Sequence, residues 1–517
     1  MQKYRILWAD DEIDLLKPHI LFLSNKGFEI TPVNSGSDAL EEIDHHTFDL
    51  VFLDENMPGM SGLETLNYIK STHPNLPVVM ITKSEEEHIM EEAIGAKIAD
   101  YLIKPLNPNQ ILLSVKKILD NKRIVSEHTN QSYQQEFQKL SMTVQDLDDF
   151  EGWADLYRKL VYWDLEIDST DDKSMLEVLN TQRSEANQRF SDFIVDNYRD
   201  WITDPDVDRP LLSHQVLKKK VFPLLKSEKP VFLIVIDNLR FDQWEILEPE
   251  ISELFNIVNK DYYYSILPTT TAYARNALFA GQMPLDIAKN HPDLWVGEDD
   301  EDGKNLYEEQ LLMKNLEKER LQVKASYHKI IKASDGKNLT DNVKNLMKND
   351  FNAIVFNFVD MLSHARTDMQ MIRELAPDES AYRSITKSWF SHSSLYDLLR
   401  YLSGKDVKVV ITTDHGTIRV KKPYKIVGDR NTNTNLRYKA GRNLAFEEKG
   451  VLFTRDPDEF RLPKVNVSTA FAFAREDFFF AYPNNYNYYV NFYKDTFQHG
   501  GVSMEEMIIP LVELAPK

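Results

Sequence analysis

Along the first 120 residues, short runs of apolar residues alternate with longer segments in which apolar residues recur every three or four positions. Short continuous runs are typical of buried strands, and the longer spacing is typical of helices packed on one side. The expected strands cover residues 5–10, 28–34, 49–55, 76–83 and 100–105, and the expected helices cover 12–27, 63–73, 85–98 and a segment that starts at 107. This alternation predicts an α/β domain with a doubly wound parallel sheet, whose functional side chains gather at the carboxyl ends of the strands.

The pattern changes twice further along the chain. Between residues 123 and 205, apolar residues such as Trp153, Tyr157 and Leu160 keep helical spacing and strand-like runs are absent, which predicts a small helical bundle or linker. From residue 206 the strands return. Three continuous apolar runs, within 230–239, 353–362 and 407–416, each lead into an Asp. Such runs suit central parallel strands covered on both faces. We therefore expect three parts, residues 1–122, 123–205 and 206–517.

Composition narrows the function. The 517 residues are 42% hydrophobic and carry a formal net charge of −21, which argues against a nucleic-acid scaffold held by a general basic face. A small nucleotide held locally by metal stays possible. The sequence has no apolar run of membrane-spanning length, and the N-terminus has a strand pattern rather than that of a signal peptide, so we expect a cytoplasmic protein without a membrane span. Because cysteine is absent, any metal must be held by His and carboxylate ligands.

Polar residues stand at the ends of four expected N-terminal strands: Asp10 and Asp11, Asp54, Thr82, and Lys104. Converging carboxylates offer the hard oxygen ligands that Mg²⁺ prefers. The ion would offset charge repulsion when Asp54 attacks a phosphoryl group. Lys104 would then pair with the new phosphate, and Thr82 would donate a hydrogen bond to it. Ordinary turn chemistry explains a single Asp after a strand, but it does not explain the ordered set.

The segments ILWADDE, VFLDENMPGMSG, VVMITK and ADYLIKP closely resemble the receiver domain of bacterial response regulators. The resemblance implies that Asp54 accepts phosphate from a histidine kinase. It also implies that Asp11, Asp54 and the backbone carbonyl of Asn56 hold one Mg²⁺, with Asp10 in support. Tyr101 matches the aromatic switch position, and the Lys104–Pro105 peptide bond is expected to be cis.

The C-terminal part offers three Asp and three His residues in short motifs: Asp237, Asp360, His364, Asp414, His415 and His499. Carboxylate and imidazole ligands at strand ends suit zinc or manganese. Six such residues exceed the needs of one tetrahedral ion. Two ions a few ångströms apart serve displacement at phosphorus, so a two-metal site is the natural hypothesis.

A nucleophile for such a site is offered by Thr269, Thr270 and Thr271, which open an expected helix. A helix N-terminus favours phosphate, and a metal can lower the pKa of a hydroxyl enough for attack. Plain N-capping is the alternative role of these threonines. Beside the Asp and His set, the nucleophile hypothesis is favoured.

The order of these motifs resembles the alkaline phosphatase superfamily, and specifically its PglZ branch, over residues 206–517. The resemblance implies an alkaline-phosphatase-like α/β domain. Asp360, His364 and His499 would hold one Zn²⁺, and Asp237, Thr271, Asp414 and His415 would hold the other. Thr271 would be the nucleophile, and Arg275 or Asn276 would steady a non-bridging oxygen. The superfamily includes monoesterases, diesterases and phosphomutases.

The three parts together resemble PorX-type response regulators of type IX secretion. This implies contacts with a secretion-motor component and a sigma factor, and a homodimer formed on phosphorylation. Two functional interpretations stay open. The output domain is either a two-zinc phosphodiesterase acting on nucleotide-type phosphoesters and gated by Asp54, or a partner-binding scaffold whose metals serve folding. The available threonine favours catalysis, because a purely structural site has no use for a nucleophile.

Overall fold

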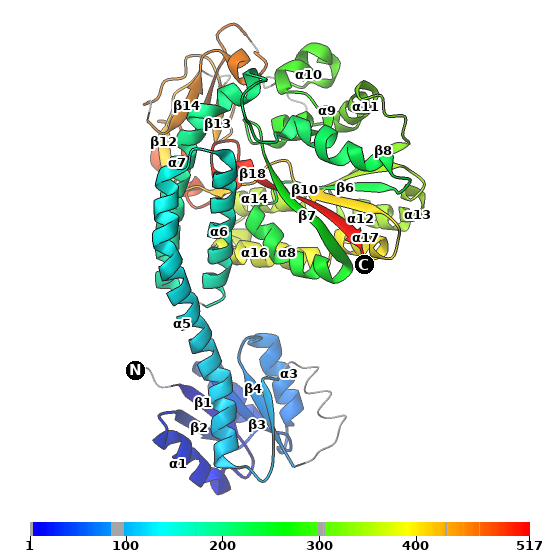
Figure 1. The fold of residues 1–517 in the computed structure, drawn as a ribbon. Helices are drawn as coiled ribbons and strands as arrows, with labels where there is room; N and C mark the ends of the chain where they lie inside the picture. Colours follow the sequence, from blue (N-terminus) through cyan, green and yellow to red (C-terminus); the bar gives the residue numbers. More distant parts are fainter. Residues whose placement is uncertain are drawn as a thin grey trace. The chain divides into compact units, whose positions relative to one another are not determined.

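The computed structural model describes residues 4–83, 98–170, 172–297, 303, 305–429, 432–447, 449–464 and 466–517, with side chains except those of 120–128. The helix expected over residues 85–98 lies outside the described residues except for its last position. The chain forms two compact units, Met1–Gln134 and Gln135–Lys517, and each is described by itself. Figure 1 shows both.

The N-terminal unit is built on a five-stranded parallel sheet in the order β2-β1-β3-β4-β5. Its strands are β1 (Arg5–Ala9), β2 (Glu29–Val33), β3 (Leu50–Asp54), β4 (Val78–Thr82) and β5 (Asp100–Ile103). Its described helices are η1 (Ile13–Leu16), α1 (Lys17–Asn25), α2 (Gly36–His45), α3 (Gly62–Thr72) and the first part of α5 (Pro108–Asp146). The expected doubly wound α/β fold is confirmed.

Alternate residues of β1 face opposite helix layers, as a strand buried on both sides requires. Leu7 and Ala9 pack with apolar residues of α2 and α3. Ile6 and Trp8 pack with apolar residues of α1 and α5. The candidate phosphorylation residues lie at the carboxyl edge of the sheet and belong to neither apolar cluster.

Three helices make up the segment that follows: α5, α6 (Phe150–Asp168) and α7 (Lys173–Thr203). The sequence suggested one helix from 107 and separate helices after 123, but α5 is continuous from Pro108 to Asp146. No Gly or Pro interrupts residues 109–146, so nothing in the local sequence ends the helix. Asp149 and Asp172 cap the next two helices by accepting hydrogen bonds from backbone N–H groups.

The C-terminal domain is built on a six-stranded sheet in the order β7-β18-β10-β6-β9-β8. β10, β6, β9 and β8 are parallel, whereas β18 is antiparallel to both of its neighbours. The strands of the domain are β6 (Val231–Ile236), β7 (Phe255–Tyr264), β8 (Ala325–Ile330), β9 (Phe351–Phe356), β10 (Lys408–Thr412), β11 (Ile418–Arg419), β12 (Lys422–Lys425), β13 (Tyr438–Gly441), β14 (Val451–Thr454), β15 (Ala470–Ala474), β16 (Phe478–Ala481), β17 (Phe497–Gln498) and β18 (Ile508–Pro516).

Helices cover both faces of this sheet (Figure 1). The helices are α8 (Phe241–Leu254), α9 (Asn276–Ala280), α10 (Pro284–Asn290), α11 (Glu308–Lys318), α12 (Ala333–Asp341), α13 (Val343–Leu346), α14 (Phe358–Asp368), α15 (Gln370–Leu375), α16 (Glu379–Ser391), α17 (Ser394–Ser403), α18 (Tyr486–Tyr493) and α19 (Met504–Met507). The shorter turns are η2 (Ser213–Gln215), η3 (Leu217–Val221), η4 (Phe222–Lys226), η5 (Thr271–Arg275), η6 (Pro292–Leu294) and η7 (Pro457–Phe460).

The central strand β6 shows how the sequence forms this core. Phe232, Ile234 and Ile236 pack with α8, α12, α14, α16 and α17. Val231, Leu233 and Val235 pack with α9, α10 and α11 on the other face. All six side chains are fully buried, and full burial of one such side chain contributes about 1.5–3 kcal/mol.

The second apolar run, within 353–362, does not form one long strand into Asp360 as the sequence suggested. β9 ends at Phe356, and α14 begins at Phe358. Asp360 and His364 therefore lie one turn apart on a helix rather than at a strand end, and spacing of four residues places both on one helix face.

A two-stranded ladder ties together two distant segments. β11 pairs with β17, so that Ile418, just after His415, lies opposite Gln498, just before His499. This pairing brings two predicted metal-ligand loops to the same place.

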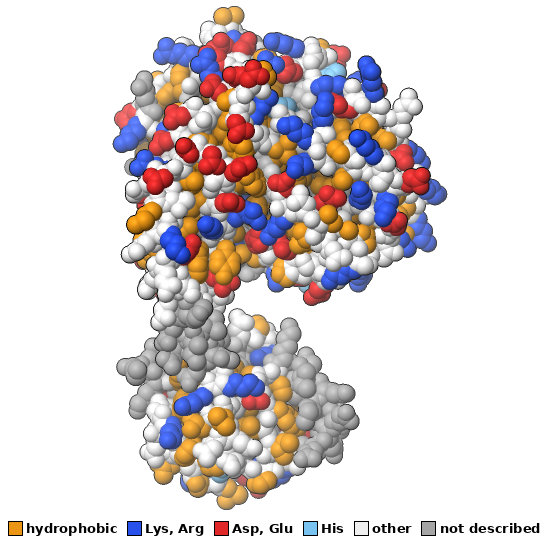
Figure 2. Space-filling view, viewed as in Figure 1, with side chains coloured by type: hydrophobic (Ala, Val, Ile, Leu, Met, Phe, Trp, Pro, Cys, Tyr) orange, Lys and Arg blue, Asp and Glu red, His pale blue; other side chains and the backbone are white. Residues whose placement is uncertain are grey.

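No helix among the described residues is both long enough and apolar enough to cross a bilayer. On the face of residues 135–517 seen in Figure 2, basic and acidic side chains are intermixed.

Candidate active site

The N-terminal acidic cluster lies where adjacent parallel strands β1 and β3 end. Carboxylate oxygens of Asp10, Asp11 and Asp54 lie within 4.8 Å of one another. Lys104 Nζ lies 2.6 Å from Asp54 Oδ1 and 2.9 Å from Asp10 Oδ2. Burial raises the pKa of Asp54 although Lys104 opposes the shift. Burial alone would lower the pKa of Lys104, but its hydrogen bonds to Asp54 and Asp10 raise it. An all-oxygen ligand set of this kind fits Mg²⁺.

Other predicted residues of this domain surround the cluster. The backbone N–H of Asn56 donates to Asp54 Oδ2 at 3.2 Å. Thr82 is fully buried and donates to Glu55, which the sequence analysis did not single out. Tyr101 is partly buried against the core on the α2 and α3 side. The Lys104–Pro105 bond is cis, so that prediction is confirmed.

In the C-terminal domain, Asp237, Asp414 and His415 form a buried cluster at the carboxyl ends of neighbouring strands β6 and β10. Their ligand atoms lie within 4.8 Å of one another. Thr271, the first residue of η5, points its hydroxyl into this cluster. Thr271 Oγ1 lies 3.2 Å from Asp237 Oδ1 and 3.2 Å from His415 Nε2. The neighbouring Thr270 hydroxyl is also buried and has no hydrogen-bond partner among the described residues.

A second cluster consists of Asp360, His364 and His499, whose ligand atoms also lie within 4.8 Å of one another. His499 Nε2 is 3.5 Å from Asp360 Oδ1, and His364 Nε2 is 3.6 Å from Asp360 Oδ2. The rings of His499 and His415 stack with centroids 4.4 Å apart, so the two clusters are adjacent. The structure thus brings together all six predicted Asp and His ligands and Thr271.

Arg275 and Asn276 lie beside the first cluster but are engaged by protein groups. Arg275 is fully buried, with Nη1 2.6 Å from Asp237 Oδ2 and Nε 2.5 Å from Glu308 Oε1. Asn276 is buried and donates to the carbonyl of Ala272 at 2.9 Å. Arg275 therefore balances ligand carboxylates directly, and Glu308 is a buried partner that the sequence analysis did not identify.

In the C-terminal domain, Asn238 is a second residue that the sequence analysis missed. Its backbone N–H donates to Asp414 Oδ1 at 3.4 Å, and its side-chain amide donates to Asp360 Oδ1 at 3.3 Å. It therefore joins the two clusters. It adopts a left-handed conformation with φ of 65°, which Asn tolerates better than most residues. The sequence signal that could have identified Asn238 is its position directly after Asp237 at the end of a buried strand.

The donor chemistry of these clusters fits zinc. One cluster offers a carboxylate and two imidazoles, and the other offers two carboxylates, an imidazole and a hydroxyl. Mixed oxygen and nitrogen ligands are typical of zinc sites without cysteine. Asp414 Oδ2 is buried and accepts no hydrogen bond from a described residue. Because buried carboxylates are costly without matching positive charge, the site suits added cations.

The pKa shifts reflect the same crowding of charge. Burial raises the pKa of Asp237 well above its usual value, and the nearby carboxylates of Asp414 and Asp360 add to the shift. Burial lowers the pKa of His415 to about 4. For His499, burial favours the neutral ring, but the bond to Asp360 outweighs it and raises the pKa.

Comparison with known families agrees with this geometry. A family model described as the BREX system PglZ alkaline phosphatase-like domain matches residues 216–514, more than half of the chain. The chain belongs to this PglZ family. The response regulator receiver domain model matches residues 6–116, and the PorX response regulator linker domain model matches residues 123–202. The combination is the PorX-type architecture, with a receiver domain followed by a helical linker and a PglZ domain.

The following curated relatives match over about the length of the receiver domain. Transcriptional regulatory protein ZraR of Escherichia coli O157:H7 is 34% identical over 124 residues, which are 24% of this chain and 28% of that protein. Alginate biosynthesis transcriptional regulatory protein AlgB of Pseudomonas putida is 32% identical over 120 residues, which are 23% of this chain and 27% of that protein. The chain thus spans about a quarter of the length of these relatives.

Solved structures also match over the receiver domain. A CheY-like receiver from Methanospirillum hungatei is 27% identical, covers 23% of this chain and 96% of its own, and has a TM-score of 0.23. Chemotaxis protein CheY4 of Vibrio cholerae is 26% identical, covers 23% of this chain and 100% of its own, and has a TM-score of 0.22.

Proposed function

We propose that this protein is a two-component response regulator whose PglZ domain is a two-zinc phosphodiesterase. The observation that carries the proposal is the position of the Thr271 hydroxyl, 3.2 Å from two ligands of one cluster and next to the second cluster. A receiver domain implies a histidine kinase as partner, and Asp54 is the proposed acceptor of its phosphoryl group. Residues 1–122, 123–205 and 206–517 are the proposed switch, linker and output parts.

In the proposed PglZ reaction, Thr271 attacks phosphorus while the bond to the leaving oxygen breaks. Water then hydrolyses the phosphothreonine and restores the hydroxyl. Asp360, His364 and His499 would hold one zinc ion, and Asp237, Thr271, Asp414 and His415 would hold the other. Bound zinc supplies Lewis-acid stabilisation of the attacking and leaving oxygens. Arg275 holds Asp237 in place, and Asn238 fixes Asp360 relative to Asp414.

In the receiver, Asp11, Asp54 and the Asn56 carbonyl would hold one Mg²⁺, which offsets charge repulsion during phosphoryl transfer. Lys104 already contacts Asp54 and is in place to pair with the phosphoryl group. Thr82 would have to exchange its bond to Glu55 for one to the phosphoryl group, with Tyr101 as the proposed switch residue. Phosphorylation is expected to promote a homodimer.

A nucleotide-type phosphoester is the proposed substrate. Tyr488 and Tyr489 on α18, in the segment that leads to β17 and His499, are exposed and stack on Phe492 and Tyr493 of the same helix. Surface packing is the ordinary role of such rings, and stacking of bases on them is the alternative that a nucleotide substrate would use. The proposed setting is the cytoplasm and type IX secretion, where a secretion-motor component and a sigma factor are the expected partners. A pure scaffold, the alternative, would use the Thr271 hydroxyl at most as a metal ligand and has no use for a nucleophile.

The test is a turnover assay of purified full chain on nucleotide monoesters, diesters and cyclic oligonucleotides, with zinc quantified on the same sample. The proposal expects two zinc ions per chain and hydrolysis of diesters faster than that of monoesters. A protein that holds two zinc ions and hydrolyses no member of the panel supports the scaffold instead.

A further inference from the structure

Two consecutive glutamates lie in the short helix α19, close behind the loop that carries His499. Glu505 and Glu506 are buried, with 3% and 0% of their surface exposed. Their side chains contact different parts of the molecule. Glu506 binds loops of the PglZ domain, whereas Glu505 binds helix α7 of the linker. Buried carboxylates are retained only with well-formed hydrogen bonds and counter-charges, and both residues have them.

Glu506 holds both histidine loops of the metal site. Its Oε1 accepts a hydrogen bond from the backbone N–H of Gly501 at 2.9 Å, two residues after His499. Its backbone carbonyl accepts one from the N–H of Gly416 at 3.2 Å, directly after His415. Arg437, fully buried, pairs with the same carboxylate at 2.6 Å. Ser503 adds a hydrogen bond of 2.7 Å.

The glycines in these loops permit the close approach. A Cβ at Gly501 would lie 2.8 Å from Nη2 of Arg437, and a Cβ at Gly416 would overlap the backbone oxygen of Glu505. The loops therefore rest directly on the Glu505–Glu506 backbone and on Arg437. A displacement of α19 must displace the backbone next to His415 and His499.

Glu505 connects this assembly to the linker. Arg183 Nε on α7 donates to Glu505 Oε1 at 2.8 Å, and Asn187 Nδ2 donates to Glu505 Oε2 at 2.9 Å. The side-chain carbonyl of Asn187 accepts from the backbone N–H of Met504 at 2.9 Å. Next to Arg183, Gln182 donates to the carbonyl of Phe137 on α5 at 3.1 Å. Helix α7 is thus bonded on one side to α5 and on the other to α19.

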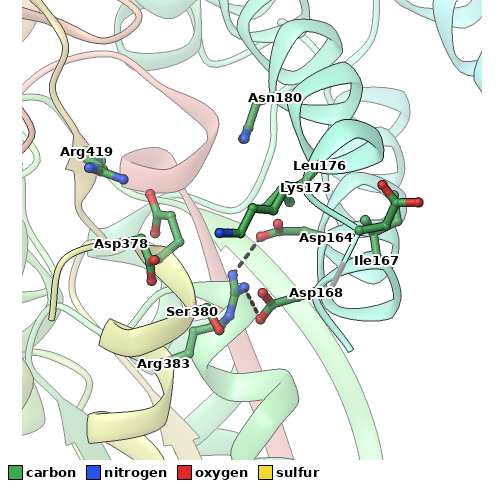
Figure 3. A pocket seen from close by; sticks show the side chains of 12 residues that line it. Asp164, Ile167, Asp168, Lys173, Leu176, Asn180, Asp378, Ser380, Arg383 and Arg419 are labelled. Atoms are coloured by element: carbon green, nitrogen blue, oxygen red, sulfur yellow. Dashed lines mark hydrogen bonds and ion pairs between the residues drawn. The ribbon is translucent and has the colours of Figure 1, made fainter. Parts of the chain in front are cut away.

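Around Glu505 the seam between the linker and the PglZ domain is polar and contains open space, whereas farther along α7 Phe190 and Trp201 pack against Tyr264 of β7. Figure 3 shows Arg383 of α16 bonded to Asp164 and Asp168 of α6, beside a cavity of about 250 Å³. A second cavity of about 80 Å³ is lined by Arg183, Asn187 and Glu505 themselves. A seam of ion pairs with adjacent cavities can rearrange more readily than a close-packed apolar core.

We propose that Glu505 and Glu506 are positioning residues that make zinc binding depend on the placement of helix α7. Glu506 fixes the loops that bear His415 and His499. Glu505 transmits the position of α7 to Glu506 through their shared helical turn. The inference rests on the zinc ligands proposed above and not on the substrate.

Coupling of this kind is reciprocal. If α7 affects the zinc site through Glu505, zinc binding must in turn stabilise α7. In the wild-type full chain, zinc is therefore expected to slow hydrogen exchange of α7 amides around Arg183 and Asn187. The same slowing should be lost in Glu505→Gln, while residues of β6 and β10 keep their protection.

Zinc affinity is the second measurement, made by competition with a chromophoric chelator. Glu506→Gln is expected to weaken zinc binding about 10- to 100-fold, as is typical when a group that supports a metal ligand is changed. Glu505→Gln is expected to weaken it less. The double variant Glu505→Gln/Asn187→Asp moves the carboxylate across the interface and should recover affinity. Asp168→Asn, which alters another ion pair of the seam, is the matched control and should bind zinc like wild type.

Cobalt substituted for zinc adds a spectroscopic readout, because its visible absorption reports ligand geometry. The proposal expects a changed spectrum in both glutamine variants and a wild-type spectrum in the double variant. Wild-type affinity and spectrum in folded Glu505→Gln, or unchanged exchange of α7 on zinc addition to the wild type, would overturn it. If Glu506→Gln does not fold, the Glu505 variants and the wild-type exchange experiment still decide. A wild type that binds no zinc overturns the ligand assignment itself, which is a distinguishable failure.

Discussion

The receiver and PglZ domains both gather acidic residues at the carboxyl edge of a parallel sheet, but they compensate the charge differently. In the receiver, Lys104 contacts both Asp10 and Asp54, and Asp11 is exposed to water. In the PglZ domain, Asp237 and Asp414 are fully buried, and the nearby Arg275 is shared with Glu308. The receiver thus has its counter-ion built in, whereas the PglZ site has more buried carboxylate than its cations balance.

This difference teaches that strand topology determines where a site lies, whereas the chemistry and burial of its ligands determine which metal it binds and which reaction it supports. An oxygen ligand set that includes the exposed Asp11 suits a weakly held Mg²⁺ that helps an Asp side chain to receive a phosphoryl group. The buried cluster of Asp237, Asp414 and His415 suits tightly held zinc beside a hydroxyl nucleophile, and the second cluster, in which His364 is exposed, leaves that ion open to substrate. Four predictions test this contrast.

Asp54→Ala should abolish modification of the receiver by acetyl phosphate in the presence of Mg²⁺, because Asp54 is the proposed acceptor and Asp10, which also contacts Lys104, is proposed only to support the metal. Intact-mass analysis measures the added phosphoryl mass. Equal phosphorylation of Asp54→Ala and wild type would show that Asp54 is not the acceptor.

Thr271→Val should lower diester turnover by about a thousandfold or more, as expected on loss of a catalytic nucleophile. Zinc content should stay near that of wild type, because the Asp and His ligands remain. Thr271→Ser keeps the hydroxyl and is the matched control, which should retain most of the rate. Near-normal turnover by zinc-loaded Thr271→Val would assign the attack to water or to Thr270.

Removal of metal should affect the two domains unequally. Chelation of zinc should destabilise the PglZ domain by about 3–4 kcal/mol, if zinc was present at 100 to 1,000 times its dissociation constant. Removal of Mg²⁺ should change receiver stability little, because Lys104 remains to balance the carboxylates. Calorimetry with zinc-selective and magnesium-selective chelation distinguishes the two. Equal destabilisation of both domains would contradict the contrast in charge compensation.

The smallest effect concerns buried histidines of the C-terminal domain. His415 has a folded pKa of about 4 because of burial, and so has His214, away from the metal clusters. The unfolded chain takes up protons near pH 6.5 and the folded chain does not, so each group's stabilising contribution is present above about pH 6.5 and is lost as pH falls toward 4. The change is on the order of 3 kcal/mol per group.

Urea unfolding of the metal-free protein at several pH values measures this slope. His415→Gln and His214→Gln should each flatten it relative to wild type. With zinc bound, His415 should affect the pH dependence of the unfolding free energy through competition between protons and zinc for its imidazole. The contribution of His214, which lies away from the metal clusters, should stay the same. A wild-type slope in metal-free His415→Gln would show that its imidazole is not held neutral.

Much of this site could be predicted from local sequence. Asp237 and Asp414 each follow a continuous apolar strand, and Asp360 and His364 have the spacing of one helix face. The distant partners could not be predicted. Asn238 reaches both clusters with its backbone N–H and its side-chain amide from a left-handed conformation, and Glu505 contacts Arg183 on a helix more than 300 residues earlier. The continuity of α5 was missed because helix spacing alone does not show whether two helical segments are joined.

The most direct test of the account is anomalous diffraction at the zinc edge from crystals of the full chain equilibrated with zinc and magnesium. The account predicts two zinc peaks, one among Asp360, His364 and His499 and the other among Asp237, Asp414, His415 and Thr271. It predicts no zinc peak in the receiver when magnesium is in excess. A single peak, or zinc bound at Asp10, Asp11 and Asp54 with none in the PglZ domain, would contradict it.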